Sequence, residues 1–451
     1  MNFTESIFKA YDIRGISGEE LTNELAHAVG RAVADFLPDS GPVIVGRDMR
    51  VDSNDLAKAV IEGLTKQGRD VWDIGLVTTD MVYFGAGRFA DEVAGGVMVT
   101  ASHNPGKYNG IKLIGRGSVP MGAQNGLMDI KEIVKSDGYK PAAETAGKVT
   151  ERSITKEWVD KIVEFLDVEA LPKWRIAVDA GNGMGGAIFP ALQERLPFEV
   201  EQMYFELDGT FPNHVANPHL VETLADLCAT IKKNKLDFGL AFDGDGDRGG
   251  LVDDEGNPLP EHIIGAMLSK QFLADNPGAK IVVDLRVSHV VKDTIEANGG
   301  TYLRSKVGND AIKTIMRNED AVLGIEASGH YYFRDAYFSD SGIIAVMSVV
   351  NILAKSGKKL SELVSEFGQA YATAHETNFE VEDKQGAFDR VREKYQDGEQ
   401  DELDGLTVSY GDWWFNIRAS NTEPVVRLNV EAKDQATLEH RLAELTQLIG
   451  G

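Results

Sequence analysis

The sequence predicts an α/β fold of three consecutive mixed α/β domains with a similar strand-helix layout. A smaller C-terminal α+β domain follows, and the four domains are expected around a central cleft. Short runs rich in Val, Ile, Phe and Tyr alternate with amphipathic segments, which is the pattern of βαβ units and parallel sheets. The order strand, helix, strand, helix, strand occurs three times, beginning near residues 42, 175 and 280.

The three repeats define the predicted elements in order. The strands are expected at 42–45, 71–74 and 96–100, at 175–178, 199–205 and 238–242, and at 280–283, 301–303 and 321–324. Amphipathic periodicity predicts helices at 53–67, 224–233 and 263–273.

The last part of the chain has a different pattern. Strand-like runs at 406–410, 413–418 and 424–432 precede an amphipathic helix at 435–448. The acid-rich stretch 376–404 is expected to be a solvated connector, remote from the loops described below. The predicted domains are therefore 1–146, 147–252, 253–369 and 370–451.

Composition limits the classes of function. The chain has 451 residues with 46 Lys and Arg against 71 Asp and Glu, a net charge of −25. Neither a nucleic-acid partner nor a membrane partner is expected, because both need a basic surface. The single cysteine, Cys228, and a start without an apolar leader predict a cytoplasmic protein. We expect a monomer or a small homo-oligomer.

The segment DGDGDR (243–248) predicts a metal site. Asp243, Asp245 and Asp247 directly follow an apolar run, and three carboxylates on alternate residues of a turn suit Mg²⁺ or Ca²⁺. An EF-hand loop is excluded, because it needs Gly where Arg248 stands and Glu where Asp254 stands. Arg248 can bind an anion shared with the metal, such as a phosphate.

Three further loops carry polar side chains where ligands bind in open α/β sheets. TASHNP (100–105) offers Ser102 as a nucleophile beside His103, and Lys112 follows in a short apolar run. EASGH (326–330) offers acceptors and donors for sugar hydroxyls. RASNTEP (418–424) has the composition of a loop that binds a phosphate without cleaving it.

A glycine-rich segment supports a competing hypothesis. Residues 181–186 read GNGMGG after a strand, and Glu201 lies further along, as in a dinucleotide-binding motif. We interpret the segment as a strand-to-helix turn, because a nicotinamide site leaves the other four loops unexplained.

Taken together, the four loops resemble those of the α-D-phosphohexomutase superfamily. TASHNP is similar to its phosphoserine loop, DGDGDR to its metal loop, GIEASGH (324–330) to its sugar-binding loop and RASNTEP to its phosphate-binding loop. FKAYDIRG (8–15) and NGIKL (109–113) resemble the bacterial phosphomannomutase/phosphoglucomutase group.

This resemblance implies a role for each matching residue. Ser102 carries a phosphoryl group and, with Asp243, Asp245 and Asp247, holds Mg²⁺, while Arg248 steadies that group. Proton transfer falls to one of three candidates, which are His103, Lys112 and Arg14. The sugar is bound by Glu326, Ser328 and His330, and the non-reacting phosphate by Arg418, Ser420, Asn421 and Thr422.

The implied enzyme is an isomerase that acts on a small-molecule sugar phosphate. It interconverts hexose 6-phosphate and hexose 1-phosphate, of mannose or glucose, through a hexose 1,6-bisphosphate that also serves as activator. A phosphoglucosamine mutase, a metal-dependent sugar phosphatase and an NAD-dependent oxidoreductase are the alternatives.

Overall fold

The structure, a computed structural model, describes residues 3–38, 40–367, 371–419 and 425–450. These residues divide into two compact units. The first comprises Met1–Ile264 and Ser328–Leu363, and the second comprises Gly265–Ala327 and Val364–Gly451. Helices α8 (Glu261–Asp275) and α12 (Leu360–Ser365) each contain residues of both units. Within the described residues, no helix is long and apolar enough to cross a membrane.

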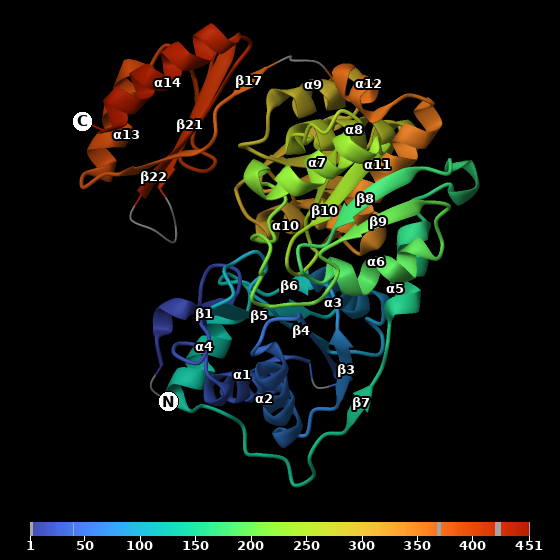
Figure 1. Cartoon of the computed structure of the whole chain (residues 1–451). Coiled ribbons are helices and arrows are strands. Elements are labelled where there is room, and N and C mark those ends of the chain that lie inside the picture. Colours follow the sequence, from blue (N-terminus) through green and yellow to red (C-terminus); the bar gives the residue numbers. More distant parts are fainter. Residues whose placement is uncertain (1–2, 39, 368–370, 420–424, 451) are drawn as a thin grey trace. The chain divides into compact units, whose positions relative to one another are not determined.

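The first unit begins with a sheet in the order β1–β5–β4–β2–β3–β7. Its central strands are buried on both faces, as expected where helices cover a parallel sheet. Figure 1 shows α1 and α2 side by side on this sheet. The elements are β1 (Ile13–Ile16), β2 (Val43–Arg47), β3 (Val71–Leu76), β4 (Gly95–Val99), β5 (Tyr108–Gly115), β6 (Val119–Pro120), β7 (Val149–Glu151), α1 (Asn23–Phe36), α2 (Ser53–Lys66), α3 (Thr79–Arg88) and α4 (Leu127–Ser136).

A second sheet of this unit has the order β11–β10–β8–β9. Strand β10 is buried along its whole length and leads into the aspartate loop. The unit is completed by a β15–β16 hairpin and by α11, a largely apolar and buried helix. The elements are α5 (Thr155–Val163), β8 (Arg175–Asp179), α6 (Gly185–Gln193), β9 (Glu199–Met203), α7 (Ala225–Asn234), β10 (Phe238–Phe242), β11 (Gly249–Val252), β15 (Tyr331–Phe333), β16 (Ser339–Asp340) and α11 (Gly342–Ser356).

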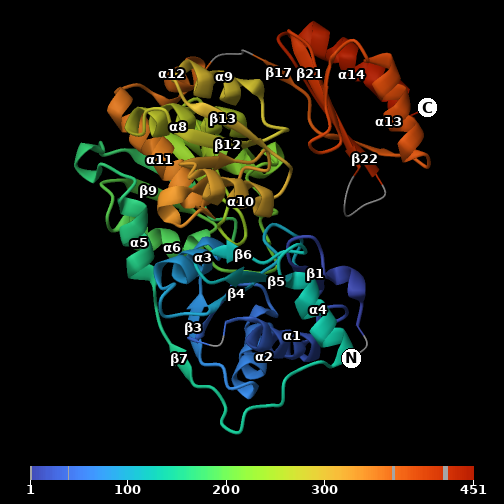
Figure 2. The ribbon, with the colours of Figure 1, turned by 180° about the vertical axis from the view of Figure 1, so that it is seen from behind.

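The second unit contains a parallel set of strands and an antiparallel sheet. Strand β12 pairs in parallel with β13 and β14. The antiparallel sheet has the order β17–β22–β21–β20–β19, with β18 also on β22, and α13 and α14 lie on one of its faces (Figures 1 and 2). The elements are β12 (Lys280–Asp284), α9 (His289–Ala297), β13 (Thr301–Ser305), α10 (Asn309–Glu319), β14 (Leu323–Ile325), β17 (Ala372–Thr373), β18 (Thr377–Glu380), α13 (Lys384–Lys394), β19 (Glu399–Asp401), β20 (Leu406–Ser409), β21 (Trp413–Ala419), β22 (Val425–Ala432) and α14 (Gln435–Gly450).

The structure confirms the α/β class and corrects two details. First, the sheets of the first unit are mixed, because β5 returns antiparallel to β4 and β11 antiparallel to β10. Each return follows a loop too short for a parallel crossover. Second, the stretch 376–404 is no connector, since it supplies two strands and a helix to the C-terminal sheet.

Candidate active site

The predicted phosphoserine loop follows β4 and holds Ser102 in a strained conformation. Ser102 has φ of 52°, a left-handed conformation that is uncommon for residues other than glycine. Its backbone N–H donates to Thr100 Oγ1 at 2.9 Å. Its hydroxyl donates to Asp243 Oδ2 at 3.1 Å and lies 3.1 Å from His103 Nδ1. The loop thus directs Ser102 Oγ at the first aspartate of the metal loop.

A buried arginine that the sequence reasoning missed holds this loop in place. The Arg50 guanidinium donates to the carbonyl oxygens of Ser102 at 2.7 Å and Asn104 at 2.6 Å. It also donates to Pro105 O at 3.1 Å and Tyr108 O at 3.0 Å. Four charge-assisted bonds therefore fix the loop backbone.

The Arg50 side chain is itself fixed by a buried carboxylate. Its Nε lies 3.2 Å from Asp48 Oδ2, and both side chains are nearly inaccessible to solvent. Asp48 also accepts a hydrogen bond from Ser53 Oγ at 2.5 Å. The buried pair keeps the guanidinium oriented toward the loop.

The three aspartates of the metal loop converge as the sequence predicts. One carboxylate oxygen from each of Asp243, Asp245 and Asp247 lies within 4.8 Å of the others, and all three residues are buried. Asp245 Oδ1 is buried and has no hydrogen-bond partner among the described residues. This donor set of hard oxygens with an unused ligand atom fits Mg²⁺.

The glycine-rich turn at 181–186 packs against the metal loop. Met184 N donates to Gly244 O at 2.9 Å, and a Cβ on Gly183 would lie 2.8 Å from the same oxygen. Helix α6 begins at Gly185, as the strand-to-helix interpretation expects. The glycines are needed for this close approach of two backbones.

The carboxylate cluster shifts the pKa values of its members in opposite directions. Burial raises the pKa of Asp243 well above its ordinary value, and the negative charges of Asp247 and Asp245 raise it further. Burial also opposes ionisation of Asp247, but Lys112 and His330 hold its pKa well below the ordinary value. A divalent cation would relieve the repulsion that makes Asp243 retain its proton.

Lys112 forms part of the same cluster. Its Nζ lies 2.9 Å from Asp245 Oδ2 and 2.7 Å from Asp247 Oδ2. Burial alone would lower the pKa of Lys112, yet these two carboxylates raise it well above its ordinary value. The two ion pairs therefore favour the charged form of the Lys112 side chain.

His103 and Arg14 differ in their ability to move a proton. Burial lowers the pKa of His103 to about 2, with Arg248 and Arg14 acting in the same direction, so the ring is neutral, and it becomes a better base only when negative charge is added beside it. Burial disfavours the charge of Arg14, but Asp12 raises its pKa. Arg14 donates to Asn104 Oδ1 at 2.9 Å, so it supports the loop as a permanent cation.

Arg248, Ser328 and His330 lie on the metal side of the site. Arg248 N donates to Asp243 Oδ1 at 3.2 Å, and its Nε lies 3.4 Å from His330 Nε2. His330 Nε2 is 3.5 Å from Asp247 Oδ1, and its Nδ1 is 3.0 Å from Ser328 Oγ. Two residues predicted to bind sugar hydroxyls thus connect to the metal loop.

The second unit brings together another part of the predicted site. Arg418 Nη2 lies 2.7 Å from Glu376 Oε2, and Arg286 lies 3.8 Å from Glu376 and 3.5 Å from Glu326. Glu326 and Arg418 therefore share one charged cluster with Arg286 and Glu376. The expectation that the stretch 376–404 is remote from the loops is wrong at Glu376, which contacts Arg418 of RASNTEP. Three predicted phosphate ligands lie outside the described residues, namely Ser420, Asn421 and Thr422.

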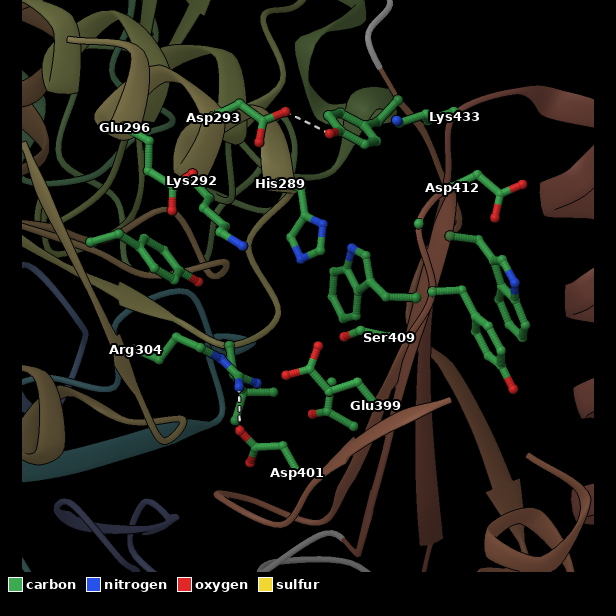
Figure 3. Close-up of a pocket in the computed structure, with 18 residues that line it drawn as sticks. His289, Lys292, Asp293, Glu296, Arg304, Glu399, Asp401, Ser409, Asp412 and Lys433 are labelled. Atoms are coloured by element: carbon green, nitrogen blue, oxygen red, sulfur yellow. Dashed lines mark hydrogen bonds and ion pairs between the residues drawn. The ribbon is translucent and has the colours of Figure 1, made fainter. Parts of the chain in front are cut away.

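A pocket of about 680 Å³ in the second unit is separate from these groups. One side of the pocket is formed by α9 and β13, and the other side by β19, β20 and β21. None of the predicted site residues lines the pocket. Figure 3 shows His289 and Lys292 of α9 on one side and Glu399 and Ser409 on the other. Arg304 forms an ion pair with Asp401 at the edge of the pocket.

Comparison with known proteins identifies the family of the chain. The chain matches the four family models of phosphoglucomutase/phosphomannomutase. These are the α/β/α domains I at residues 5–140, II at 156–256 and III at 260–371, and the C-terminal domain at 376–448.

Similar proteins match along almost the whole chain. "Phosphohexose mutases" of Xanthomonas campestris pv. campestris are 39% identical over 447 residues, which is 98% of this chain and 99% of the relative. A phosphomannomutase of Escherichia coli strain K12 is 38% identical over 451 residues, 98% of each chain. The crystal structure of a phosphoglucomutase/phosphomannomutase family protein from Burkholderia thailandensis superposes with a TM-score of 0.90 at 30% identity, covering 99% of this chain and 98% of that one. The chain therefore belongs to the phosphoglucomutase/phosphomannomutase family, a family of isomerases within the α-D-phosphohexomutase superfamily.

Proposed function

We propose that this enzyme interconverts hexose 6-phosphate and hexose 1-phosphate, of mannose or glucose, through a phosphorylated Ser102 and a hexose 1,6-bisphosphate. One observation carries the proposal. Ser102 Oγ lies 3.1 Å from Asp243, the first of three buried and converging aspartates, and 3.1 Å from a neutral imidazole. A nucleophile, a base and a magnesium site in one cluster are the requirements of phosphoryl transfer.

The charges of the site fit a doubly charged phosphoryl group on Ser102. Such a group carries about −1.5 to −2 at neutral pH and repels an incoming sugar phosphate. Asp243, Asp245 and Asp247 would hold Mg²⁺, which when bound neutralises phosphoryl oxygens. Arg248 and Lys112 add positive charge at positions fixed by the fold, which needs no rearrangement during the transfer.

The reaction requires two phosphoryl transfers. In the first, the bond between Ser102 Oγ and phosphorus breaks as a sugar hydroxyl forms a new oxygen–phosphorus bond. The hydroxyl proton must end on Ser102 Oγ, and His103 Nδ1 is close enough to carry it. A phosphoryl group on Ser102 would raise the pKa of this ring, because negative charge stabilises imidazolium.

The second transfer uses the opposite end of the bisphosphate. The intermediate turns, and its other phosphate passes to Ser102, whose proton now leaves by way of His103. Arg418 would bind whichever phosphate is not reacting, together with Ser420, Asn421 and Thr422. Glu326, Ser328 and His330 would bind sugar hydroxyls.

We further propose that the C-terminal segment moves to admit and release the sugar phosphate. Its contacts with residues 280–307 include polar ones, such as Tyr371 Oη to Asp293 Oδ2 at 2.5 Å and His289 N to Glu431 Oε1 at 2.9 Å. Its apolar cluster is formed by residues of 372–449. The contacts also include the stacking of His289 on Trp414. Polar contacts such as the two hydrogen bonds separate at lower cost than an apolar interface.

The first test is a coupled assay with mannose 1-phosphate, glucose 1-phosphate and glucosamine 1-phosphate, activated by glucose 1,6-bisphosphate. Ser102→Ala is expected to abolish turnover, whereas Ser136→Ala, on an exposed turn of α4, is expected to leave it unchanged. Near-normal turnover in Ser102→Ala would refute the mechanism. Preference for the glucosamine substrate would favour phosphoglucosamine mutase, and release of inorganic phosphate would favour a phosphatase.

We also propose that the chain is divided into the four domains 1–146, 147–252, 253–369 and 370–451. The protein is proposed to be a cytoplasmic monomer or small homo-oligomer without nucleic-acid or membrane partners.

A further inference from the structure

Three guanidinium groups surround the carboxylate of Glu376. Arg418 Nη2 lies 2.7 Å from Oε2, Arg427 Nη1 lies 3.3 Å from Oε1, and Arg286 Nη1 lies 3.8 Å from Oε2. Glu376 directly precedes β18, which pairs with β22. The four side chains come from separate parts of the second unit, so the folded chain assembles this cluster.

The arginines need an anion between them. Arg418 of β21 and Arg427 of β22 are register partners across the antiparallel pair, and like charges at opposite positions destabilise a sheet. Glu376 removes this repulsion when nothing else is bound. A phosphate bound to Arg418 would do the same, so the two anions can substitute for one another.

The charge of the cluster is balanced without a ligand. Arg286 also contacts Asp284 and Glu326, and these carboxylates hold the pKa of Arg286 above its ordinary value although burial opposes its charge. Among the described residues, three arginines thus face three carboxylates, Asp284, Glu326 and Glu376. A sugar phosphate that enters must compete with Glu376 for the guanidinium groups.

Arg418 retains capacity for a second anion. The residue is only 5% exposed, and its Nε is buried without a hydrogen-bond partner among the described residues. A buried guanidinium with an unused donor is costly unless a ligand takes it up. Glu376 therefore satisfies only part of the hydrogen-bonding capacity of Arg418.

We propose that Glu376 is a resident counter-anion that replaces the sugar's non-reacting phosphate on Arg418 and Arg427. The proposal rests on the proposed function, in which Arg418 holds that phosphate. A bisphosphate must release one phosphate from this clamp before it binds the other. By occupying the vacated guanidinium groups, Glu376 lowers the cost of that release and weakens phosphate binding.

The test measures phosphate affinity in Ser102→Ala protein, which cannot turn over. Calorimetric titration with inorganic phosphate and with mannose 1-phosphate compares two proteins. One carries Ser102→Ala alone, and the other carries Ser102→Ala together with Glu376→Gln. Because a negative charge near the ligand is removed while a hydrogen-bonding side chain is kept, we expect about tenfold tighter binding. Glu380→Gln, at an exposed acid that ends β18, the strand that Glu376 precedes, is the matched control and is expected to bind like the parent.

Kinetics with Ser102 intact give a second readout. Glu376→Gln is expected to lower KM and kcat together, because phosphate binds more tightly and leaves more slowly. Unchanged or weaker phosphate binding in Glu376→Gln, with an unaltered thermal midpoint, would overturn the proposal and leave Glu376 as a structural support. If Arg418→Gln does not weaken binding in the parent, the clamp itself fails and with it this part of the proposed function.

Discussion

Replacing Arg50 by lysine tests whether the geometry of the phosphoserine loop, and not its charge alone, supports catalysis. Lysine keeps a positive charge beside the buried Asp48 carboxylate. It cannot reproduce the planar guanidinium that donates to Ser102 O, Asn104 O, Pro105 O and Tyr108 O.

The size of the effect follows from these four bonds. A hydrogen bond from a charged donor contributes about 1.5–3 kcal/mol, so losing two of them weakens the loop by roughly 3–6 kcal/mol. Such a loss frees the loop to shift, and a displacement of about 1 Å at a reacting group costs about 10²-fold in rate. Arg50→Lys is therefore expected to lower kcat about 100-fold with little change in KM.

The assay is the coupled mutase reaction at saturating glucose 1,6-bisphosphate, with amide exchange of residues 102–108 as the structural readout. Arg47→Lys, at the end of the strand β2 that precedes Arg50, is the control, because Arg47 forms a partly exposed ion pair with Asp73 and contacts of that kind contribute little. A kcat for Arg50→Lys within threefold of the parent, with faster amide exchange in the loop, would refute the reasoning.

Two further perturbations probe the metal loop and its surroundings. EDTA is expected to stop turnover and Mg²⁺ to restore it, while Asp245→Asn should weaken Mg²⁺ binding more than about tenfold; calorimetric binding equal to the parent would contradict this. Burial raises the pKa of Asp80 to about 8, so the folded state holds a proton that the unfolded state has lost, and stability should fall as pH rises from about 4 to about 8. Asp80→Asn is expected to make the urea unfolding midpoint, measured at pH 5, 7 and 9, depend less on pH. A pH dependence equal to that of the parent would contradict this prediction.

Much of the site could be predicted because ligands bind beyond the carboxyl ends of the strands in open α/β sheets. Ser102 and the three aspartates lie just beyond the carboxyl ends of buried strands, where the residues of an α/β sheet can meet a ligand. The same rule also applies to Arg50 after β2, Asp80 after β3 and Arg286 after β12, but their segments carry no unusual motif. A search of strand ends for any charged residue would have found them.

Other features could not be read from local sequence. Glu376 lies in a stretch dominated by acids, and only the pairing of β18 with β22 brings it to Arg418 and Arg427. The antiparallel return of β5 was missed for a related reason, since NGIKL is short and its neighbour in the sheet is set by the loop before it. The sequence leaves proton transfer open among His103, Lys112 and Arg14, because burial and ion pairing, which distinguish their surroundings in the fold, are not visible in local sequence.

Transfer of a labelled phosphoryl group tests the proposed function most directly. The protein is treated with glucose 1,6-bisphosphate labelled with ³²P and is then freed of small molecules. One part is digested, and the labelled peptide is identified by mass spectrometry. The other part is kept intact and receives unlabelled hexose 6-phosphate. The mechanism predicts label on Ser102 that moves quantitatively to a bisphosphate when unlabelled hexose 6-phosphate is added. Label on another residue, or its release as inorganic phosphate, would contradict the mechanism.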